Sequence, residues 1–405
     1  MPPTSRFLSR TLTPPFRGFF LGRLVSLLGS AMNPVALALA VLDASGRPRD
    51  LGVVLAAQIV PHLALLLVGG AVADRYSRRA VLVAANLGAG ITQGAVAAVL
   101  ITGRYDLPLV AGLGLANGAL DAFASPALRG IVPELVAPDD LQRANALLAS
   151  ARNATKILGP TVAALLVVGV GGGWAIAVDA LSYLAAAGLL ARLPASTVAV
   201  RRGHLFADIR DGWREFLGIP WVWIVTLSCG LINLVHLGAW QVLGPQLTSE
   251  RGGEALWGVV LSVRAIGLLV TSVVMCRVTL RHPLRAGLAT GAVGGLALVA
   301  LGLHADVPVL LASALVSGMG FTALGIAWDT ALQQHVPRDA LSRVSSYSDL
   351  LSYVTMPVSQ LLIGPVAARW GGAPVAFWCG IAFAVVALTP LAARSVRNLP
   401  AAAPT

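Results

Sequence analysis

The strongest constraint on this chain is its series of long apolar runs, each long enough to cross a lipid bilayer. A membrane-spanning helix needs roughly 20 predominantly apolar residues. Twelve such runs are predicted, near residues 17–42, 50–73, 80–101, 107–131, 144–168, 172–192, 220–246, 254–276, 284–303, 307–332, 344–367 and 373–393. The composition agrees, because 57% of the 405 residues are hydrophobic and 12% are charged, whereas soluble domains contain about 25% charged residues. We therefore expect an all-α membrane protein.

The arginines predict how the chain is oriented in the membrane. A net charge of +11 would suggest nucleic-acid binding in a soluble protein, but here the basic residues lie in short segments between the apolar runs. With a cytoplasmic N-terminus, twenty arginines fall in cytoplasmic segments and five in the opposite loops, at Arg47, Arg49, Arg104, Arg251 and Arg369. Arginine-rich loops stay in the cytoplasm. We therefore expect both termini in the cytoplasm, the lipid bilayer as a partner and no nucleic acid.

Motifs of catalysis or metal binding are missing from the sequence. The three cysteines, Cys229, Cys276 and Cys379, are isolated, and no Cys/His spacing suits a metal site. No phosphate-binding loop, zinc-protease motif or nucleophile elbow occurs. We expect no enzymatic activity, no cofactor and no bound metal, with the thiols free.

A polar stretch divides the chain into two halves with six apolar runs each. We predict an N-terminal six-helix bundle over residues 1–192, a cytoplasmic linker over 193–219 and a C-terminal six-helix bundle over 220–405. Within the linker, apolar residues recur at helical spacing, at Leu205, Ile209, Trp213 and Phe216. This pattern predicts a short amphipathic helix at the cytoplasmic surface of the membrane.

The two halves carry a weak internal repeat. The segment 139–143 (Asp-Asp-Leu-Gln-Arg) resembles 339–343 (Asp-Ala-Leu-Ser-Arg), and each is followed by a Gly-Pro pair, at 159–160 and at 364–365. Because an even number of spans separates the copies, both halves have the same orientation. Parallel repeats of this kind place a substrate site near the bilayer midplane.

Residues 70–79 form a charged link between two apolar runs, with the pattern Gly-x-x-x-Asp-Arg-x-x-Arg-Arg. This pattern resembles the loop 2–3 signature of the major facilitator superfamily of transporters. The resemblance implies a fold of twelve transmembrane helices in two six-helix bundles, and secondary active transport. It also implies a cytoplasmic gate at Gly70, Asp74, Arg75, Arg78 and Arg79. We add Asp329 and Asp349 to this gate, because both lie toward the cytoplasmic end of their spans.

Other segments resemble one branch of that superfamily, which contains the enterobactin exporter and macrolide-efflux-type proteins. They are residues 126–136, 141–147, 179–183 and 208–216. Residues 155–164 resemble the antiporter motif of the fifth helix, with Gly159 and Pro160 kept and its outer glycines replaced. Glycine permits close helix contact and proline favours a kink. The branch and the motif imply export, although an ordinary kinked helix would have the same features.

Charged residues within predicted spans are candidates for proton coupling, because a charge at the bilayer centre costs about 2.5–3.5 kcal/mol. Lys156 lies ~14 Å inside if its helix begins near Leu147, and Asp121 lies ~18 Å from the outer end of its own span. Arg152 is one helical turn before Lys156. We predict that Asp121 accepts a proton or pairs with Arg152 or Lys156 in a state-dependent way; a permanent salt bridge is the alternative. Arg264 either contacts a charged substrate or pairs with a carboxylate.

A polar face on the seventh span is a candidate for the cavity lining. Asn233, His236, Trp240 and Gln241 share one side of a helix at offsets of 0, 3, 7 and 8. Seven single polar residues in other spans could also line the cavity, although each alone is more typical of a helix–helix hydrogen bond. These are Asn33, Gln58, His62, Asn86, Gln93, Asn117 and Gln360.

These features predict proton-driven export of a small amphipathic compound, such as a drug or a siderophore-like metabolite. The predicted location is a bacterial cytoplasmic membrane, and the expected partners are the small-molecule substrate and protons, with a monomeric protein. Two alternatives stay open. One is an importer or uniporter of a small solute, and the other is a non-transporting sensor or scaffold on the same fold.

Overall fold

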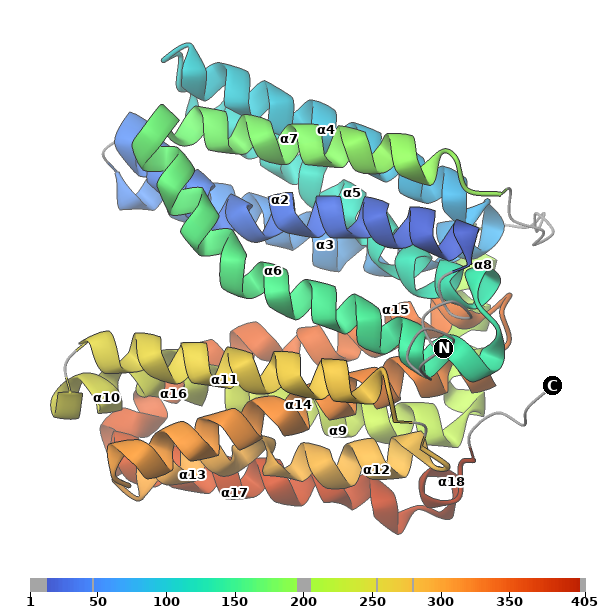
Figure 1. Cartoon of the computed structure of the whole chain (residues 1–405), viewed down its shortest axis with the longest axis vertical. Coiled ribbons are helices and arrows are strands. Elements are labelled where there is room, and N and C mark those ends of the chain that lie inside the picture. Colours follow the sequence, from blue (N-terminus) through green and yellow to red (C-terminus); the bar gives the residue numbers. More distant parts are fainter. Residues whose placement is uncertain (1–12, 46, 195–204, 253, 279, 401–405) are drawn as a thin grey trace, which may run out of the picture. The chain divides into compact units, whose positions relative to one another are not determined.

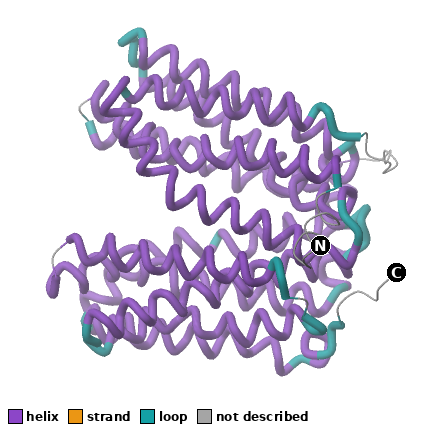
Figure 2. Tube along the Cα trace, in the orientation of Figure 1, coloured by secondary structure: helices purple, strands orange, loops and turns teal. Residues whose placement is uncertain are grey.

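A computed structural model describes residues 13–45, 47–194, 205–252, 254–278 and 280–400. Within these ranges the chain forms helices and no strand (Figure 2). Part of the predicted linker, 195–204, lies outside the described residues, as do four of the arginines counted as cytoplasmic, at positions 6, 10, 201 and 202. The described residues contain twelve helical segments long and apolar enough to cross a membrane. The predicted all-α membrane fold and its twelve spans are therefore confirmed.

The first six spans are single helices (Figure 1). They are α2 (Pro14–Ser45), α3 (Pro48–Arg75), α4 (Arg78–Ile101), α5 (Leu107–Leu135), α6 (Leu141–Val170) and α7 (Gly172–Leu190), with a short 3-10 helix, η1 (Pro138–Asp140), before α6. Within the predicted linker, α8 (Leu205–Gly218) forms a further helix.

The last six spans are more often interrupted. They comprise α9 (Pro220–Gly238) with the π-helical turn η2 (Ala239–Leu243) and α10 (Gly244–Gly252); α11 (Glu254–Met275); α12 (Pro283–Gly291) with η3 (Ala292–Gly295) and α13 (Leu296–Gly302); α14 (Val307–His335); α15 (Leu341–Tyr353) with α16 (Thr355–Trp370); and α17 (Gly372–Leu388) with η4 (Thr389–Ala392) and α18 (Arg394–Arg397).

The breaks between helices follow local sequence. A proline in the first turn begins α3, α5, α9, α12 and α14, where its missing N–H is not needed. Gly171 and Gly371 separate α6 from α7 and α16 from α17, with φ angles of 94° and 85°. Glycine adopts this backbone region without steric cost. The two glycines occupy matching positions in the two halves, which agrees with the internal repeat.

The chain separates into two compact units, each of which takes in a short segment from the other half of the sequence. Unit 1 contains residues 1–137, 154–212 and 337–346, and unit 2 contains 138–153, 213–336 and 347–405. In unit 1, α3 packs against α5, and α7 packs against α2 and α4. In unit 2, α11 packs against α14, and α17 packs against α9 and α13. The same helix pairings therefore recur in both units, as parallel repeats predict.

Apolar side chains both fill the units and cover their surfaces. The core of unit 1 includes Leu37, Val54 and Ile176, which are at most 1% exposed. Large apolar side chains also lie on the outside, with Val168 exposed by 88% and Leu361 by 77%. An apolar surface of this extent suits contact with lipid rather than water.

Candidate functional site

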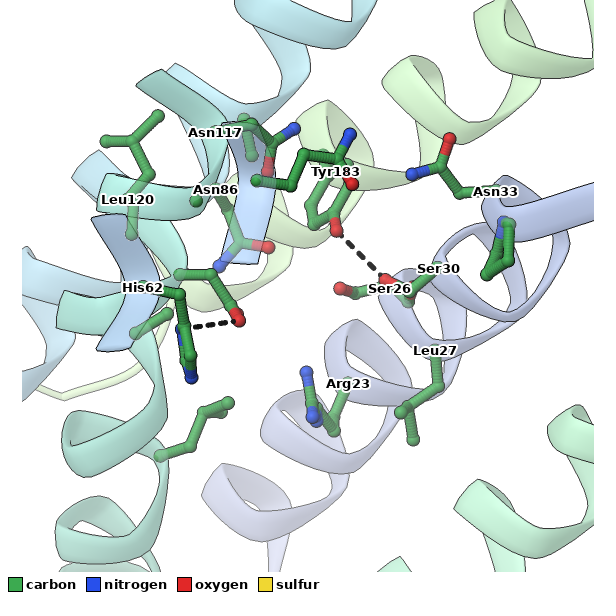
Figure 3. A pocket seen from close by; sticks show the side chains of 18 of the residues that line it. Arg23, Ser26, Leu27, Ser30, Asn33, His62, Asn86, Asn117, Leu120 and Tyr183 are labelled. Carbon is green, nitrogen blue, oxygen red and sulfur yellow. Dashed lines mark hydrogen bonds and ion pairs between the residues drawn. The ribbon is translucent and has the colours of Figure 1, made fainter. Parts of the chain in front are cut away.

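Unit 1 contains a cavity of about 370 Å³ whose lining is unusually polar for an apolar bundle (Figure 3). Each helix around it supplies polar side chains: Arg23, Ser30 and Asn33 from α2, Gln58 and His62 from α3, Asn86 from α4, Asn117 and Asp121 from α5, and Tyr183 from α7. Cavities of this size hold small organic ligands. The cavity is therefore the first candidate site for a transported compound.

An acid–base pair lies at the wall of this cavity. Nδ1 of His62 lies 3.1 Å from a carboxylate oxygen of Asp121. The side chain of Asp121 is 62% exposed, whereas that of His62 is 18% exposed. The two helices approach closely here, because a Cβ atom at Gly118 would overlap the backbone carbonyl of Gln58. The pair is ionic when the imidazole is protonated, so its strength changes with the proton occupancy of either partner.

Amide groups at the cavity wall have unused hydrogen-bonding capacity. Oδ1 of Asn33 and Nδ2 of Asn117 are buried and have no hydrogen-bond partner among the described residues. The hydroxyl groups of Ser30 and Tyr183, by contrast, lie 3.0 Å apart and pair with each other (Figure 3). Buried polar atoms without partners are uncommon in folded proteins. An amide acceptor and an amide donor are thus available to a polar group on a bound compound.

The two predicted cations of α6 lie on exposed positions of that helix. Arg152 belongs to unit 2 and Lys156 to unit 1. The ion-pair partner that the structure gives Asp121 is His62. Further along α6, a Cβ atom at Gly159 would lie 2.7 Å from the backbone of Ala31 in α2. The glycine of the antiporter-like motif therefore permits a close helix contact, and α6 continues through Pro160.

Asp74, in the charged link at 70–79, is the centre of a buried charge cluster in unit 1. It is 4% exposed. Its carboxylate accepts hydrogen bonds from the backbone N–H groups of Ser342, at 3.2 Å, and Arg343, at 2.9 Å. Both groups belong to the first turn of α15, where helix N–H groups lack internal partners and the helix dipole favours an anion. Asp74 therefore acts as a cap for α15 from a distant part of the sequence.

Two buried guanidinium groups complete the Asp74 cluster. Nη2 of Arg78 lies 3.2 Å from Asp74, and Nε of Arg343 lies 3.4 Å from it. Arg78 also donates from Nη1 to the carboxylate of Glu134, at 2.6 Å, and to the carbonyl of Gly130, at 3.0 Å. Two carboxylates and two guanidiniums thus neutralise one another, the condition under which buried charges are tolerated.

The remaining members of the charged link have separate contacts. Arg75 forms an ion pair with Asp208 of α8 at 3.1 Å, and both side chains are partly exposed. Arg79 donates a hydrogen bond to the carbonyl of Ala191. A Cβ atom at Gly70 would overlap the hydroxyl of Ser346, so this glycine permits α15 to approach α3. The predicted gate residues Asp329, in α14, and Asp349, in α15, lie in unit 2, and Asp349 is buried.

A second cluster, in unit 2, consists of Arg264 and the rings of Trp240, Phe321 and His236. The guanidinium carbon of Arg264 lies 4.4 Å from the ring centre of Trp240 and 5.3 Å from that of Phe321. Its Nη2 lies 3.3 Å from Nε2 of His236. Two predicted cavity residues, His236 and Trp240, thus contact Arg264, for which the sequence suggested a charged substrate or a carboxylate as the partner.

The other two predicted cavity residues of this helix make hydrogen bonds. Asn233 donates to the carbonyl of Ser352 at 3.0 Å, and Gln241 accepts from Gln360 at 2.6 Å. Trp240 and Gln241 lie in the π-helical turn η2, which changes the register of the helix. In this turn the backbone spacing differs from that of a regular α-helix, and the shared cavity face of the four residues stays a prediction.

His62 is the residue that sequence reasoning undervalued. It appeared as one of several single polar residues, without a connection to Asp121. Helical periodicity places a residue on a face of its own helix but does not say which neighbouring face it meets. The close approach of α3 and α5 through small residues is the signal that could have linked them.

Comparisons with known proteins agree with this architecture. The sequence model described as "Major Facilitator Superfamily" matches residues 19–356. The chain is 27% identical over 363 residues to the multidrug efflux pump Tap of Mycobacterium tuberculosis, covering 85% of this chain and 84% of Tap. It is 23% identical over 382 residues to the enterobactin exporter EntS of Salmonella typhimurium, covering 93% of this chain and 91% of EntS. The resemblance to the efflux branch that the sequence motifs indicated is confirmed.

A solved structure extends the agreement to three dimensions. A bacterial homologue of the iron transporter ferroportin, crystallised in an outward-facing state, matches with a TM-score of 0.76 and 19% identity, over 94% of this chain and 100% of that chain. The match confirms the fold. In the described part of this chain, no group of three or more His, Cys, Asp or Glu side chains is arranged to hold a metal ion.

Proposed function

Because the chain belongs to the major facilitator superfamily, as a match over residues 19–356 shows, we propose that it is a proton-coupled exporter of small amphipathic compounds. Drugs and siderophore-like metabolites are the compound classes that fit. In this proposal the protein lies in a bacterial cytoplasmic membrane as a monomer with both termini inside the cell. Transport proceeds by movement of two helical bundles around a central site, as in other secondary transporters.

The observation that carries the proposal is the pair of His62 and Asp121 at the wall of a polar cavity. Protonation of the carboxylate, or loss of a proton from the imidazolium, removes the ionic attraction between the two side chains. The exposed carboxylate of Asp121 gives protons access to the pair. A proton arriving at Asp121 would weaken the contact between α3 and α5, and its departure would restore that contact. The proton state would thereby bias the two conformations of the carrier.

The cations of α6 have a secondary role in this proposal. In this proposal Asp121 pairs with His62 in one conformation of the carrier and with Lys156 or Arg152 in the other. Gly159 permits close packing of α6 against α2. Pro160 lacks a backbone N–H and so removes one hydrogen bond within α6. Such a helix can change its curvature between conformations.

The Asp74 cluster serves as the cytoplasmic gate in the proposal. Asp74 binds the start of α15 through two backbone N–H groups and two guanidiniums. In this proposal the buried cluster stabilises one conformation of the carrier and separates in the other. Asp329 and Asp349 are further acidic residues of the gate in this proposal.

Export is favoured over import by the relatives. Tap is described as a multidrug efflux pump and EntS as an enterobactin exporter, and the antiporter-like Gly-Pro of α6 points the same way. An importer or uniporter would use the same cavity without extruding its substrate. A sensor or scaffold would retain the fold but move no solute.

The proposal is tested in cells that lack their main efflux pumps. The protein, Asp121→Asn and an empty vector are compared across a panel of toxic amphipathic compounds, with growth inhibition and cell-associated compound as readouts. The exposed loop variant Asp306→Asn is the matched control, because it removes the same charge outside the spans. We expect the protein and the control to raise resistance and lower accumulation, and both a proton uncoupler and Asp121→Asn to abolish these effects. Increased accumulation would indicate import, and unchanged accumulation of every compound would contradict transport of this class.

A further inference from the structure

Arg264 is a positive charge placed well inside a membrane span. It lies in α11, within the segment Leu256–Met275 that is long and apolar enough to cross the bilayer, eight residues or ~12 Å from one end of it. Only part of its side chain is exposed. A guanidinium remains charged at any physiological pH, so the protein must compensate its charge by some other means than losing a proton.

The compensation comes from aromatic rings and one imidazole. The guanidinium lies over the faces of Trp240 and Phe321, whose negative π-surfaces attract a cation. His236 stacks on Trp240 with ring centres 5.7 Å apart and accepts the contact from Nη2 of Arg264. A protonated imidazole cannot accept, so His236 is neutral in this arrangement. Trp240, Phe321 and His236 therefore form an aromatic cage around the guanidinium, and none of the three carries a negative charge.

No carboxylate in the described residues forms an ion pair with Arg264, and its Nε is buried without a hydrogen-bond partner. The Nε of Arg78 is likewise buried without a hydrogen-bond partner, but Arg78 and Arg343 differ from Arg264 in that each lies against the carboxylate of Asp74. The donors of Arg264 are thus only partly used. The planar fork of donors on a guanidinium matches the geometry of carboxylate and phosphate groups.

Contacts with neighbouring helices hold Trp240 and His236 in position beside Arg264. Trp240 belongs to the π-helical turn η2, and turns of this type are frequent at functional sites. Just before it, the backbone N–H of Gly238 donates to the hydroxyl of Ser359 at 2.8 Å, and a Cβ atom at Gly238 would overlap α16. Phe383 of α17 packs edge-on against His236 at 5.2 Å. Neighbouring helices therefore fix the rings before any ligand arrives, which lowers the entropy cost of binding.

We propose that Arg264, with Trp240 and Phe321, binds an anionic group attached to an aromatic or other apolar body, such as a carboxylate, sulfonate or phenolate. This inference rests on the proposed transport function and names the substrate class: anionic amphipaths. The guanidinium supplies charge-assisted hydrogen bonds to the anion, and the rings supply apolar contact to the attached body. Binding also supplies the negative charge that the site lacks.

The test uses two probes of the same shape that differ in charge, 2-naphthoate and 2-naphthamide. Binding to the full-length protein in detergent is measured by equilibrium dialysis, without any proton gradient. The variants are Arg264→Gln, which removes the charge, and Arg264→Lys, which keeps it. We expect the wild type to bind naphthoate, Arg264→Gln to bind it roughly 10- to 100-fold more weakly, and naphthamide to bind weakly and alike to both. Arg264→Lys should retain part of the affinity for naphthoate.

Two further controls keep the outcome interpretable. Gel filtration verifies that each variant is folded, and Trp240→Phe, which keeps a ring face beside Arg264, should weaken naphthoate less than Arg264→Gln does. Equal binding of naphthoate by wild type and Arg264→Gln would overturn the proposal, as would equal binding of the two probes by the wild type. Failure of the wild type to bind naphthoate up to its solubility limit would also overturn it. Because no gradient or flux is involved, these results are independent of whether Asp121 couples transport to protons.

Discussion

Two buried charge sites in this protein are built in opposite ways. The Asp74 cluster in unit 1 is balanced in charge, because Asp74 and Glu134 offset Arg78 and Arg343, and two backbone N–H groups of α15 donate to Asp74. The Arg264 site in unit 2 has one charge, aromatic neighbours and a neutral imidazole.

This difference indicates that the two sites have different roles. A charge-balanced cluster has no net charge to attract a ligand, and removing one of its members leaves a buried charge without a partner. Such a cluster is suited to hold together helices that lie far apart in the sequence. The Arg264 site has a partly buried charge without an acidic partner among the described residues, which costs free energy. A bound anion would offset that cost, so the site is suited to bind a ligand. Stability measurements can therefore separate the two roles, because substitutions in the two sites should change stability with opposite sign.

The largest expected effect is at Asp74. Asp74→Ala leaves Arg78 and Arg343 without their shared carboxylate and leaves two backbone N–H groups at the start of α15 unpaired. Loss of one partner from a buried ion pair costs roughly 3–5 kcal/mol. We expect a large drop in the thermal unfolding temperature in detergent and loss of the resistance phenotype. A variant as stable as wild type would show that the buried cluster contributes nothing to the fold.

The next effect concerns the packing of α15 against α3. Gly70→Ala inserts a methyl group into space occupied by Ser346 and the carbonyl of Ser342, and overpacking of this kind costs about 1–3 kcal/mol. Gly52→Ala is the matched control, because it lies in the same helix with open space around its Cβ position. Unfolding temperatures should fall for Gly70→Ala and remain unchanged or rise slightly for Gly52→Ala. Equal shifts would mean that close approach at Gly70 is unimportant.

Removing Arg264 should act in the other direction. Arg264→Met replaces a charge that has no acidic partner with an apolar chain of similar length. Relief of desolvation outweighs the lost cation–π contacts, so we expect stability to rise by roughly 1 kcal/mol. The same change at Arg78 should lower stability, because Asp74 and Glu134 would lose their shared cation. Both are read from unfolding temperatures of the unliganded protein, and destabilisation by Arg264→Met would remove the contrast between the sites.

The smallest effect is expected at Arg75. Its ion pair with Asp208 is partly exposed, and pairs of this kind contribute about 0–1 kcal/mol. Arg75→Gln and Asp208→Asn should each shift the unfolding temperature slightly, and the double variant should be no worse than the sum. A large coupling between them in a double-mutant cycle would place Arg75 with the buried cluster instead.

The twelve spans were predictable because a long apolar run has few alternatives to a membrane helix. The charged link at 70–79 was predictable from its residue pattern, and the structure brings Asp74, Arg78 and Gly70 to one helix start. That start is part of the segment 339–343, which the repeat had singled out, but nothing in the sequence pattern assigned Ser342 and Arg343 to Asp74. A contact between residues so far apart along the chain depends on tertiary packing.

The partners of the central charges were harder to predict. Depth along a helix can be counted, which is why Asp121 was a candidate, but depth does not reveal that His62 lies beside it. The π-helical turn at Ala239–Leu243 likewise departs from the regular α-helical spacing on which the prediction for Asn233, His236, Trp240 and Gln241 was based. Local changes of helix register have no clear sequence signal. They are also the places where side chains gain unusual neighbours, as Trp240 does with Arg264.

The central claim is that the proton state of the His62–Asp121 pair drives movement of the substrate. The direct test is proton flux in sealed liposomes that contain the purified protein and a pH dye, with a compound to which the protein gives resistance in cells. Addition of that compound should release or consume protons with the wild type. Asp121→Asn should abolish the proton signal while still exchanging labelled for unlabelled compound across the membrane. Exchange without proton flux in the wild type, or an unchanged proton signal in Asp121→Asn, would contradict the account.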